Sequence, residues 1–411
     1  MKFKTLDDVD VRGLRVLVRT DVNMTIRDGE IKTADKMKRA LPTIRELYTK
    51  GAKVILTSHL GQPKEPSPEF SLCPIAAALA EMLEYPVQFV DDCIGPKVTA
   101  AVGNLKNGEV ILLENSRFYP GETTNDPNFA RELAQLGDIF VHDAFSSAHR
   151  AHVTTAGLAY MLPAYAGRLM QAELEALDKA LEHPCHPVMA IAGGSKLSTK
   201  IDVLNNIIPR VDKLVLGGAM ANTFLHAQSI GIGASMYEAR AIDVVQKIMA
   251  TAKQHNCEII LPTDAQLADA VKSDAQIRTA PISDIQTHEM ILDFGPESIA
   301  RVKAALDECR TLLWNGPLGV FEVPPFDKGT VAVAQYAAAC TKSGDLISVA
   351  GGGDTAAAMN LAGVMNDFTY ISTAGGAFLE WLEGKTLPGV AALTPGQSDS
   401  DSEKLKIVSR N

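Results

Sequence analysis

The sequence predicts an α/β protein with two Rossmann-like parallel-sheet domains joined by a linking helix and a hinge. Three observations support this fold class. The chain has 411 residues, more than one typical domain core; short apolar runs alternate with segments of helical period; and one amphipathic segment lies near the middle. Because the runs are apolar throughout, they are typical of parallel strands that are buried on both faces.

Ten apolar runs account for the predicted sheets. They are Arg15–Asn23, Lys53–His59, Glu109–Asn115, Asp138–Ala144, Pro187–Gly194, Lys213–Ala219, Glu258–Asp264, Thr311–Pro317, Asp345–Gly353 and Phe368–Gly376. Open twisted sheets rarely exceed about ten strands, so we expect these runs to be divided between two sheets and two domains.

The amphipathic segment Gly167–Pro184 supplies the predicted connection between the domains. Leu169, Leu174, Leu177 and Leu181 form one apolar stripe, and Pro184 ends the pattern. We therefore expect an N-terminal domain over residues 1–166, a linking helix over 167–186, a C-terminal domain over 187–390 and a polar tail over 391–411.

The composition excludes several classes of partner. The formal net charge is −10, from 39 Lys and Arg against 49 Asp and Glu. Nucleic acids and acidic membranes both require a basic protein surface, so we expect neither as a partner. The six cysteines contain no CxxC pair and are typical of a reducing compartment. The first ten residues, MKFKTLDDVD, lack the apolar core of a signal peptide, so we expect a cytoplasmic protein.

Polar side chains follow the predicted strands of the N-terminal half, at the edge where α/β proteins collect ligands. They are Arg19, Asp21 and Asn23 after the first strand, His59 and Gln62 after the second, Arg117 after the third, and His149, Arg150 and His152 after the fourth. A single Arg is more typical of a surface loop, but several at successive strand ends favour a site for a small anion. The histidines lack an acidic or Cys partner for a metal, so we interpret them as hydrogen-bond donors.

Glycine-rich turns follow the predicted strands of the C-terminal half. They are accompanied by Lys196 and Lys200, by Asn315 and Glu322, by Gly352, Gly353, Asp354 and Thr355 at one helix start, and by Gly375 and Gly376 at another. Glycine lets backbone N–H groups approach an anion, and a helix N-terminus supplies unpaired N–H groups. Asp354 is either a helix cap, which the spacing alone favours, or a Mg²⁺ ligand if a phosphate binds beside it.

The usual nucleotide-binding signatures are absent from the sequence. The GKT at residues 384–386 has Leu379 where a P-loop requires its first glycine, and no GxGxxG follows a strand. A dehydrogenase and a Walker-type NTPase are therefore disfavoured. One domain that binds a small anion and a second that binds a nucleotide predict a two-domain phosphotransferase.

Thirteen motifs, taken in order from about Leu14 to Val390, resemble the phosphoglycerate kinase family in its bacterial form. They are RTDVN, ALPTI, SHLGQP, LLENSRF, DAFSSAHRAH, GGSKLSTK, GGAMANTF, LPTD, DFGPES, LLWNGPLGVFE, DKGT, AGGGDTAAA and STAGGAFLEWLEGKTLPGV. Each motif alone is weak, whereas the full ordered set is highly specific.

The resemblance implies a function in glycolysis and gluconeogenesis. A phosphoglycerate kinase transfers a phosphoryl group reversibly between 1,3-bisphosphoglycerate with ADP and 3-phosphoglycerate with ATP, using Mg²⁺. The resemblance also implies a monomer whose N-terminal domain binds the glycerate and whose C-terminal domain binds the nucleotide. Hinge closure around Gly167–Pro184 would bring the two substrates together. The C-terminal tail would return to the N-terminal domain.

The resemblance assigns roles to the residues named above. Asp21, Asn23, His59, Arg117 and Arg150 would hold the glycerate and its phosphate, with Lys36 and Gln62 at two further positions of this site. Lys196 would move onto the transferring phosphoryl group, and Gly375 and Gly376 would present N–H groups to it. Lys200 would contact nucleotide phosphate, while Asn315, Glu322, Gly352, Gly353 and Thr355 would hold the nucleotide and Asp354 the Mg²⁺.

This chain departs from the family pattern at several positions of that site. Lys36 and Gln62 stand where the family has Arg, and Ala374 replaces the first glycine of STGGGA. FSSAHR, with Ser146, replaces FGTAHR, a smaller change. Lys36 keeps the charge but loses the planar fork of Arg, whereas Gln62 loses the charge altogether. Arg39, one helical turn from Lys36, is a candidate for compensation.

Two other functions fit the same residues. One is a paralogous acyl-phosphate kinase with a different carboxylic acid substrate, because Lys36 and Gln62 both lie on the substrate side. The other is a weakly active nucleotide-binding protein with a regulatory role. The retained Lys196, Lys200 and Asp354 favour the working phosphoglycerate kinase over both.

Overall fold

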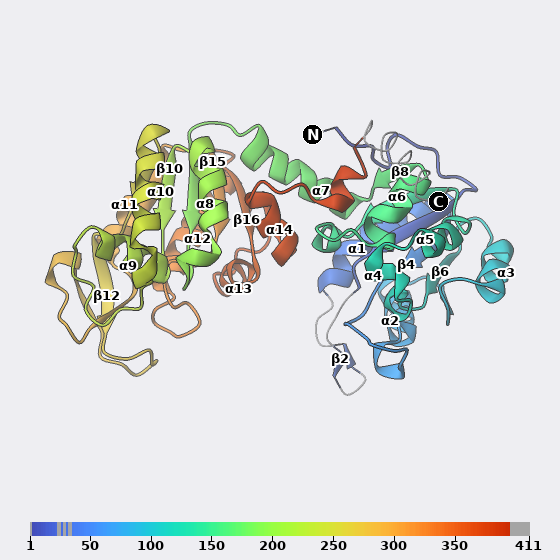
Figure 1. The fold of residues 1–411 in the computed structure, drawn as a ribbon, viewed down its shortest axis with the longest axis horizontal. Helices are drawn as coiled ribbons and strands as arrows, with labels where there is room; N and C mark the ends of the chain where they lie inside the picture. The colour runs from blue at the N-terminus through green and yellow to red at the C-terminus, as the bar shows by residue number, and fades with distance from the viewer. Residues whose placement is uncertain (1, 23–25, 28–29, 32–34, 395–411) are drawn as a thin grey trace. The chain divides into compact units, whose positions relative to one another are not determined.

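A computed structural model describes residues 2–22, 26–27, 30–31 and 35–394. The chain divides into two compact units (Figure 1). The first comprises the described residues of Met1–Leu174 and Thr386–Asn411, and the second comprises Glu175–Lys385. Each unit contains one six-stranded sheet whose paired strands are all parallel. The predicted α/β class with two parallel sheets is therefore confirmed.

The first unit is built on a sheet with the strand order β5-β6-β4-β1-β7-β8. The strands are β1 (Arg15–Thr20), β4 (Lys53–Thr57), β5 (Val87–Val90), β6 (Val110–Leu113), β7 (Ile139–Asp143) and β8 (Ala164–Ala166). A short antiparallel pair, β2 (Ile26–Arg27) and β3 (Glu30–Ile31), lies outside the sheet.

Helices cover both faces of this first sheet. They are α1 (Asp35–Thr49), α2 (Cys73–Leu83), α3 (Pro96–Asn104), α4 (Gly121–Thr124), α5 (Pro127–Ala134) and α6 (Leu158–Met161), with short turns η1 (Pro68–Phe70), η2 (Ser116–Phe118), η3 (Phe145–Ser147) and the π-helical η4 (Val153–Gly157). Val16 packs in one core cluster with Met37 of α1, whereas Leu17 packs in the other with Leu133 of α5. Successive residues of β1 therefore enter different cores, as expected for a strand buried on both faces.

The second unit has the strand order β11-β10-β9-β15-β16-β17. The strands are β9 (Val188–Ala192), β10 (Lys213–Leu216), β11 (Glu258–Ile260), β15 (Thr311–Asn315), β16 (Ile347–Gly351) and β17 (Tyr370–Ser372). The chain runs outward from β9 to β11, then returns to β15 on the other side of β9. This is the doubly wound order in which the switch point lies between β9 and β15.

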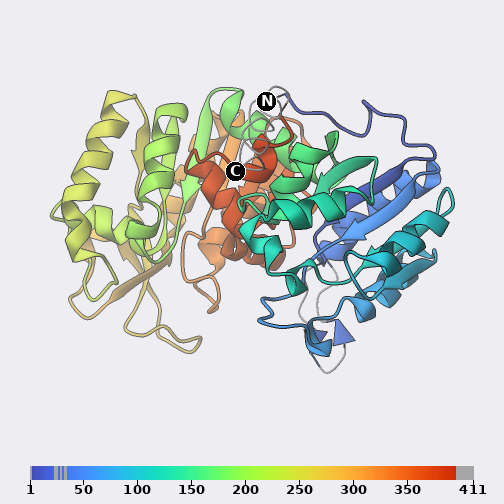
Figure 2. The same ribbon diagram turned by 45° about the vertical axis from the view of Figure 1, so that its right-hand side comes forward.

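A smaller antiparallel sheet and several helices complete the second unit (Figure 2). The small sheet comprises β12 (Asp264–Ala268), β13 (Arg278–Pro281) and β14 (Met290–Phe294). The helices are α8 (Ile201–Ile207), α9 (Gly218–Ala227), α10 (Ile242–Gln254), α11 (Pro296–Asp307), α12 (Lys328–Lys342), α13 (Gly353–Leu361) and α14 (Gly375–Leu382), with short turns η6 (Leu197–Thr199), η7 (Ile208–Arg210), η8 (Ala239–Ala241) and η9 (Ile282–Asp284). This antiparallel sheet is not among the elements predicted from the sequence.

The segment expected to link the domains contains α7 (Arg168–Leu177) followed by the π-helical η5 (Asp178–Glu182). The carboxylate of Asp143 in the first unit accepts hydrogen bonds from the backbone N–H groups of Leu169, at 2.9 Å, and Met170, at 3.2 Å. These are N–H groups of the first helical turn, so Asp143 caps α7 from a distant position in the sequence.

The C-terminal boundary differs from the expected one. The sequence predicts a C-terminal domain that extends to residue 390, but the chain returns to the first unit at Thr386 and forms α15 (Pro388–Ala391) there. The backbone N–H of Gly389 donates to the carbonyl of Ala148 at 2.8 Å, and Ala392 is buried in the core of the first unit. The apolar Leu387–Leu393 segment explains the difference, because its buried side chains need a core to pack against. Residues 395–411 lie outside the described residues.

None of the described helices is long and apolar enough to cross a lipid bilayer.

Candidate functional site

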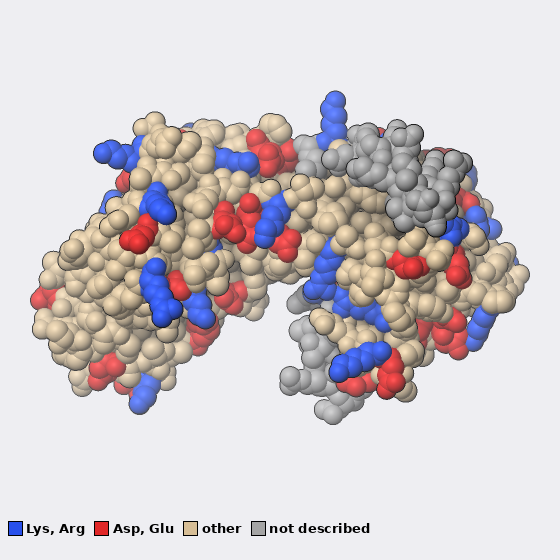
Figure 3. All heavy atoms as spheres, in the orientation of Figure 1, with Lys and Arg blue, Asp and Glu red and all other residues tan. Residues whose placement is uncertain are grey.

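Four neighbouring strands of the first sheet deliver the predicted anion-binding residues to one edge. In the order β6-β4-β1-β7, the strand ends are followed by Arg117, His59, Asp21 and Arg150, and Arg19 lies on β1 itself. Parallel strands place their carboxyl ends together, so residues far apart in the sequence converge. Figure 3 shows Lys and Arg atoms grouped on the surface of the first unit, although the whole chain carries a net charge of −10.

Arg19 and His59 are buried at this edge of the sheet. The Arg19 side chain is 1% exposed and its Nη2 contacts Nδ1 of His59, while its Nη1 donates to the hydroxyl of Thr154 at 2.8 Å. The carboxylate of Glu122 lies 4.0 Å from Nη1. Burial, and then the charge of Arg19, hold the pKa of His59 well below its usual value. His59 is therefore a neutral hydrogen-bonding group at physiological pH.

Arg117 is hydrogen-bonded to the loop that follows β4. Its Nη1 donates to the backbone carbonyl of Gly61 at 2.5 Å, and the side-chain amide of Asn115 donates to the carbonyl of Leu60 at 2.9 Å. Burial, followed by the charges of Arg150 and Arg19, lowers the pKa of Arg117 to about 10, which leaves it charged at neutral pH. Arg117 is half-buried, so part of the guanidinium remains available to a ligand.

Arg150 and the two neighbouring histidines follow η3 at the end of β7. The Nε of Arg150 lies 3.2 Å from Nε2 of His149. Burial, followed by the charges of Arg117, Arg19 and Arg150, lowers the pKa of His152 to about 4. Since protonation of His152 would add to three nearby positive charges, this histidine is a neutral partner and not a fourth cation.

The switch point between β9 and β15 of the second sheet opens into a cavity of about 360 Å³. The loops after β9, β10 and β15 contribute Gly194, Gly218 and Leu318, and the small sheet contributes Leu292 and Phe294. An apolar cavity of this size at a switch point is the usual place for a nucleotide or another drug-sized ligand in a doubly wound sheet. These apolar lining residues were not predictable from the sequence, because an apolar side chain that lines a cavity has the same sequence pattern as one that packs in a core.

A glycine allows two loops to meet at this cavity. A Cβ on Gly193 would lie 1.8 Å from the carbonyl oxygen of Pro317, so only glycine fits where the loops after β9 and β15 touch. The N–H of Gly193 donates to the carbonyl of Asn315 at 3.0 Å and closes the contact.

Lys200 lies beside Gly194, a residue that lines this cavity: a Cβ built on Gly194 would be 4.0 Å from Cε of Lys200. Its Nζ donates to the backbone carbonyl of Asn315 at 3.0 Å and contacts the side-chain oxygen of that residue. Burial lowers the pKa of Lys200 to about 8, and the charge of Asp354 opposes the shift. Lys196 precedes η6 and is exposed, so the two lysines are separated by a short 3₁₀ turn and differ in burial.

The expected alternative of Asp354 as a helix cap is wrong. The N-cap of α13 is Gly352, which has a φ of 102°, and Asp354 lies within the first turn without a capping hydrogen bond. Its carboxylate is exposed and lines the cavity. The hydroxyl of Thr355 instead accepts the N–H of Gly316 at 2.7 Å and ties the loop after β15 to α13.

The described residues contain no group of three or more His, Cys, Asp or Glu side chains placed to hold a metal ion. Asp354 therefore fits Mg²⁺ only as a single carboxylate ligand beside phosphate oxygens, which is a common arrangement for this ion.

Gly375 and Gly376 form the first turn of α14, with Ala374 as the N-cap residue. Gly376 is exposed and Gly375 partly exposed, so the unpaired N–H groups at this helix start can reach a ligand. Gly375 has a φ of 40°, a value that favours glycine.

A scan against models of known families matches the phosphoglycerate kinase model over residues 6–385. The chain belongs to the phosphoglycerate kinase family. A phosphoglycerate kinase from Methylorubrum extorquens is 56% identical over 393 residues, covering 95% of this chain and 98% of the relative. One from Zymomonas mobilis is 56% identical over 396 residues, covering 96% and 100%.

Solved phosphoglycerate kinase structures are similar over the same length. The enzyme from Coxiella burnetii has a TM-score of 0.89 at 40% identity, covering 95% of this chain and 99% of that one. The enzyme from Pyrococcus horikoshii has a TM-score of 0.77 at 28% identity, covering 97% and 99%. The protein is therefore a phosphotransferase with a carboxyl acceptor, EC 2.7.2.3, as the sequence predicted.

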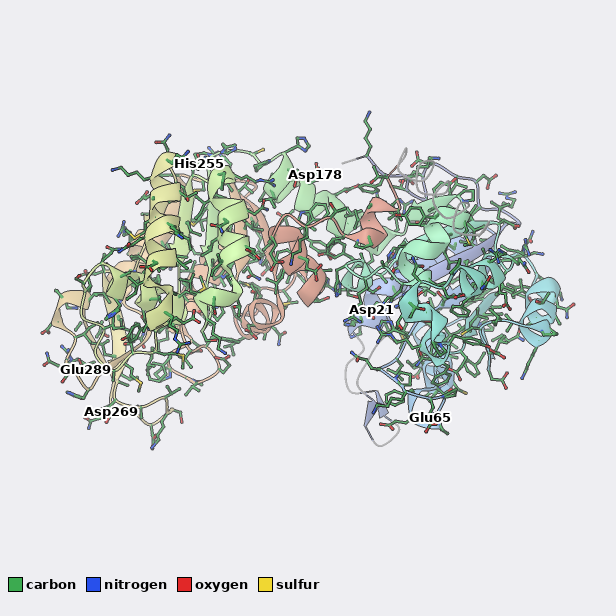
Figure 4. All side chains as sticks on the ribbon, viewed as in Figure 1. Asp21, Glu65, Asp178, His255, Asp269 and Glu289 are labelled. Carbon is green, nitrogen blue, oxygen red and sulfur yellow. The ribbon has the colours of Figure 1, made fainter. Side chains whose placement is uncertain are left out.

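Two positions that depart from the phosphoglycerate kinase pattern contact the same carboxylate. The Nζ of Lys36 lies 3.2 Å from Oδ2 of Asp21, and the hydroxyl of Ser146 donates to that oxygen (Figure 4 labels Asp21). Gln62, a further departure on the glycerate side, is exposed in the loop whose Gly61 carbonyl accepts a hydrogen bond from Arg117. Asn23, another expected site residue, lies outside the described residues.

Proposed function

We propose that this member of the phosphoglycerate kinase family catalyses the reversible, Mg²⁺-dependent transfer of a phosphoryl group between 1,3-bisphosphoglycerate with ADP and 3-phosphoglycerate with ATP, in glycolysis and gluconeogenesis. The observation that carries the proposal is that the two units contain binding sites of different chemistry. The cationic edge of the first sheet suits a small dianionic substrate, and the apolar cavity of the second suits a nucleotide.

The glycerate side uses the first unit. Arg117 and Arg150 supply charge for the phosphate and carboxylate, because guanidinium groups bind both with paired hydrogen bonds. His59 donates as a neutral imidazole, and Asp21 accepts from a hydroxyl group of the substrate. Asn23, Lys36 and Gln62 complete the proposed contacts on this side.

The nucleotide side uses the second unit. The cavity between Gly194 and Leu318 receives the base and ribose, and Glu322 at its rim accepts hydrogen bonds from ribose. Lys200, Gly352, Gly353 and Thr355 lie near the phosphates, with Asn315 holding the Lys200 ammonium in place. Asp354 holds Mg²⁺, which neutralises nucleotide phosphate charge when it is bound.

The chemistry requires positioning and charge cancellation only. The attacking carboxylate of 3-phosphoglycerate is already ionised at neutral pH, so no residue has to act as a general base. Lys196, which is exposed, moves onto the transferring phosphoryl group, and the N–H groups of Gly375 and Gly376 stabilise its oxygens. Arg150 neutralises charge on the glycerate side during transfer.

The transfer requires both substrates to meet, although the proposed binding residues belong to different units. We therefore propose that the two units close on the substrates about a hinge formed by α7 and η5, the segment that connects the units. We also propose a cytoplasmic monomer with no nucleic acid or membrane partner, since the acidic composition supports neither.

A coupled assay of ATP consumption that depends on 3-phosphoglycerate tests the proposal. We expect turnover with both substrates and Mg²⁺, and a matched Lys196→Met variant should lose transition-state stabilisation with little change in ATP binding. Absence of turnover at millimolar substrate, with ATP still bound in a calorimetric titration, would refute it in favour of a regulatory nucleotide-binding protein.

A second candidate function is phosphoryl transfer to a different carboxylic acid. It is favoured by the three departures around the glycerate site, of which Lys36 and Ser146 contact Asp21 directly. A panel of carboxylates in the same coupled assay distinguishes the two functions. A clear preference for 3-phosphoglycerate would exclude this second candidate.

A further inference from the structure

A buried chain of hydrogen bonds runs from Glu122 to His59 and joins four separate elements of the first unit. Glu122 of α4 accepts the hydroxyl of Thr154 at 2.5 Å and its backbone N–H at 3.2 Å. The Thr154 hydroxyl accepts from Nη1 of Arg19 at 2.8 Å, and Nη2 of Arg19 contacts Nδ1 of His59. All four side chains are buried, with exposed fractions of 1%, 0%, 1% and 5% for Glu122, Thr154, Arg19 and His59.

The chemistry of the donors fixes the direction of every bond in this chain. A guanidinium has only donors, so Nδ1 of His59 must accept from Arg19 and cannot carry a proton itself. A neutral imidazole carries its proton on the other nitrogen, so the hydrogen bond assigns the Nε2–H tautomer to His59. Nε2 has no hydrogen-bond partner among the described residues, and its N–H is left for a ligand.

We propose that Glu122 and Thr154 are positioning residues for the glycerate site: they fix the Arg19 guanidinium, which in turn holds His59 as the neutral Nε2–H tautomer. His59 then offers one donor of defined direction to the substrate. This inference rests on the proposed function, because it gives the Nε2–H of His59 a substrate to bind. It extends the site to two residues that follow no strand end and that touch no substrate.

The charges around His59 favour the same neutral form. The cations that face it are Arg19, Arg117, Arg150 and Lys36, while the acidic groups Glu122 and Asp21 face Arg19. Burial, and then these cations, lower the pKa of His59, and burial raises the pKa of Glu122 while the charge of Arg19 opposes that shift. Glu122 therefore acts as the buried counter-charge of Arg19 and not of His59.

Ring nitrogen spectra of the full-length protein, labelled with ¹⁵N-histidine, test the tautomer without any assay. The His59 signals are assigned by their loss in a His59→Gln variant. We expect the pattern of a neutral Nε2–H ring that does not change between about pH 6 and pH 8, although a free histidine titrates near pH 6.5. A protonated Nδ1, or titration near the ordinary pKa, would overturn the inference.

Two variants of Thr154 test the positioning role. Thr154→Val removes the hydroxyl with little change in shape, and Thr154→Ser keeps it as the matched control. We expect Thr154→Val to raise KM for 3-phosphoglycerate by roughly three- to tenfold, to leave KM for ATP unchanged and to give His59 a mixed tautomer pattern. Thr154→Ser should restore both readouts.

The outcomes separate this inference from the proposed function. A purely structural role for Thr154 predicts a lower thermal stability for Thr154→Val than for Thr154→Ser, with identical His59 spectra and KM values in the two variants, and that result would refute the positioning role. Wild-type protein without any turnover would refute the proposed function, while its His59 spectrum would still decide the tautomer. If Thr154→Val does not fold, Glu122→Gln, which keeps the shape of the side chain, takes its place with the same expectations.

Discussion

The Nζ of Lys200 donates to the backbone carbonyl of Asn315 at 3.0 Å and contacts the side-chain oxygen of the same residue, so its hydrogen-bond partners among the described residues are neutral oxygens. Burial costs the charged form part of its hydration, and the pKa falls to about 8. The negative charge of Asp354 opposes this fall in the pKa. Lys200 is therefore poised to lose its proton in a range where most lysines remain charged.

This environment predicts a pH-dependent affinity for ATP. Free protein loses the Lys200 proton as the pH rises through about 8, whereas bound phosphate favours the charged form, so binding takes up a proton above that pH. Affinity should then fall by up to about tenfold per pH unit. Calorimetric titrations from roughly pH 7 to pH 9.5 measure it, and Lys200→Arg, which stays charged, should remove the effect. Equal pH profiles for the two proteins would contradict this role.

Restoring an arginine at position 62 should strengthen glycerate binding. A hydrogen bond that carries a charge is worth about 1.5–3 kcal/mol, so Gln62→Arg should lower KM for 3-phosphoglycerate by roughly tenfold or more. KM for ATP should not change, and Gln62→Glu, the control of opposite charge, should raise KM for 3-phosphoglycerate. An unchanged KM in Gln62→Arg would show that another cation already occupies this role.

Removing the charge of Asp354 should change the requirement for Mg²⁺. Asp354→Asn deletes one ionic ligand, and we expect the free Mg²⁺ concentration for half-maximal rate to rise by roughly tenfold, equivalent to about 1.4 kcal/mol. Glu322→Gln is the matched control because Glu322 lines the same cavity but is not a proposed metal ligand. Identical Mg²⁺ titrations of wild type and Asp354→Asn would exclude this ligand.

Two glycines near the cavity should differ in their tolerance of alanine. A Cβ on Gly193 would overlap the carbonyl oxygen of Pro317, whereas one on Gly353 has no described atom within 4 Å. Backbone atoms cannot move aside as a side chain can, so Gly193→Ala should lower the free energy of unfolding by about 3 kcal/mol or more. Gly353→Ala should change it by less than about 0.5 kcal/mol. Urea denaturation measures both, and similar values would contradict the close contact.

The sheets were predictable because their signal is local. All ten apolar runs contribute strands to the two parallel sheets. The missed strands carry weak signals: β5 has a polar Gln88 within four residues, and β8 has only three residues. The small antiparallel sheet was not predictable because polar residues interrupt the apolar ones in β12, DAQLA, and in β13, RTAP.

The site was predictable only where residues directly follow a strand. Arg117 and His59 could be placed together because parallel strands end at one edge. Glu122 and Thr154 could not, since their importance comes from contacts with Arg19 across more than a hundred positions of the chain. The sequence pattern favours Asp354 as the cap, but Gly352, two residues before it, has a φ of 102° and is the N-cap residue, so the helix starts earlier.

The return of Thr386–Thr394 to the first unit has a consequence for synthesis. Because Ala392 packs in a core with Leu17 and Phe140, the first unit is assembled from two pieces of chain, one synthesised before the whole second unit and one after it. The second unit is continuous in sequence and can fold before the first is complete. A nascent chain that stalls before Pro388 would therefore carry a finished second sheet and a first sheet that still lacks part of its core.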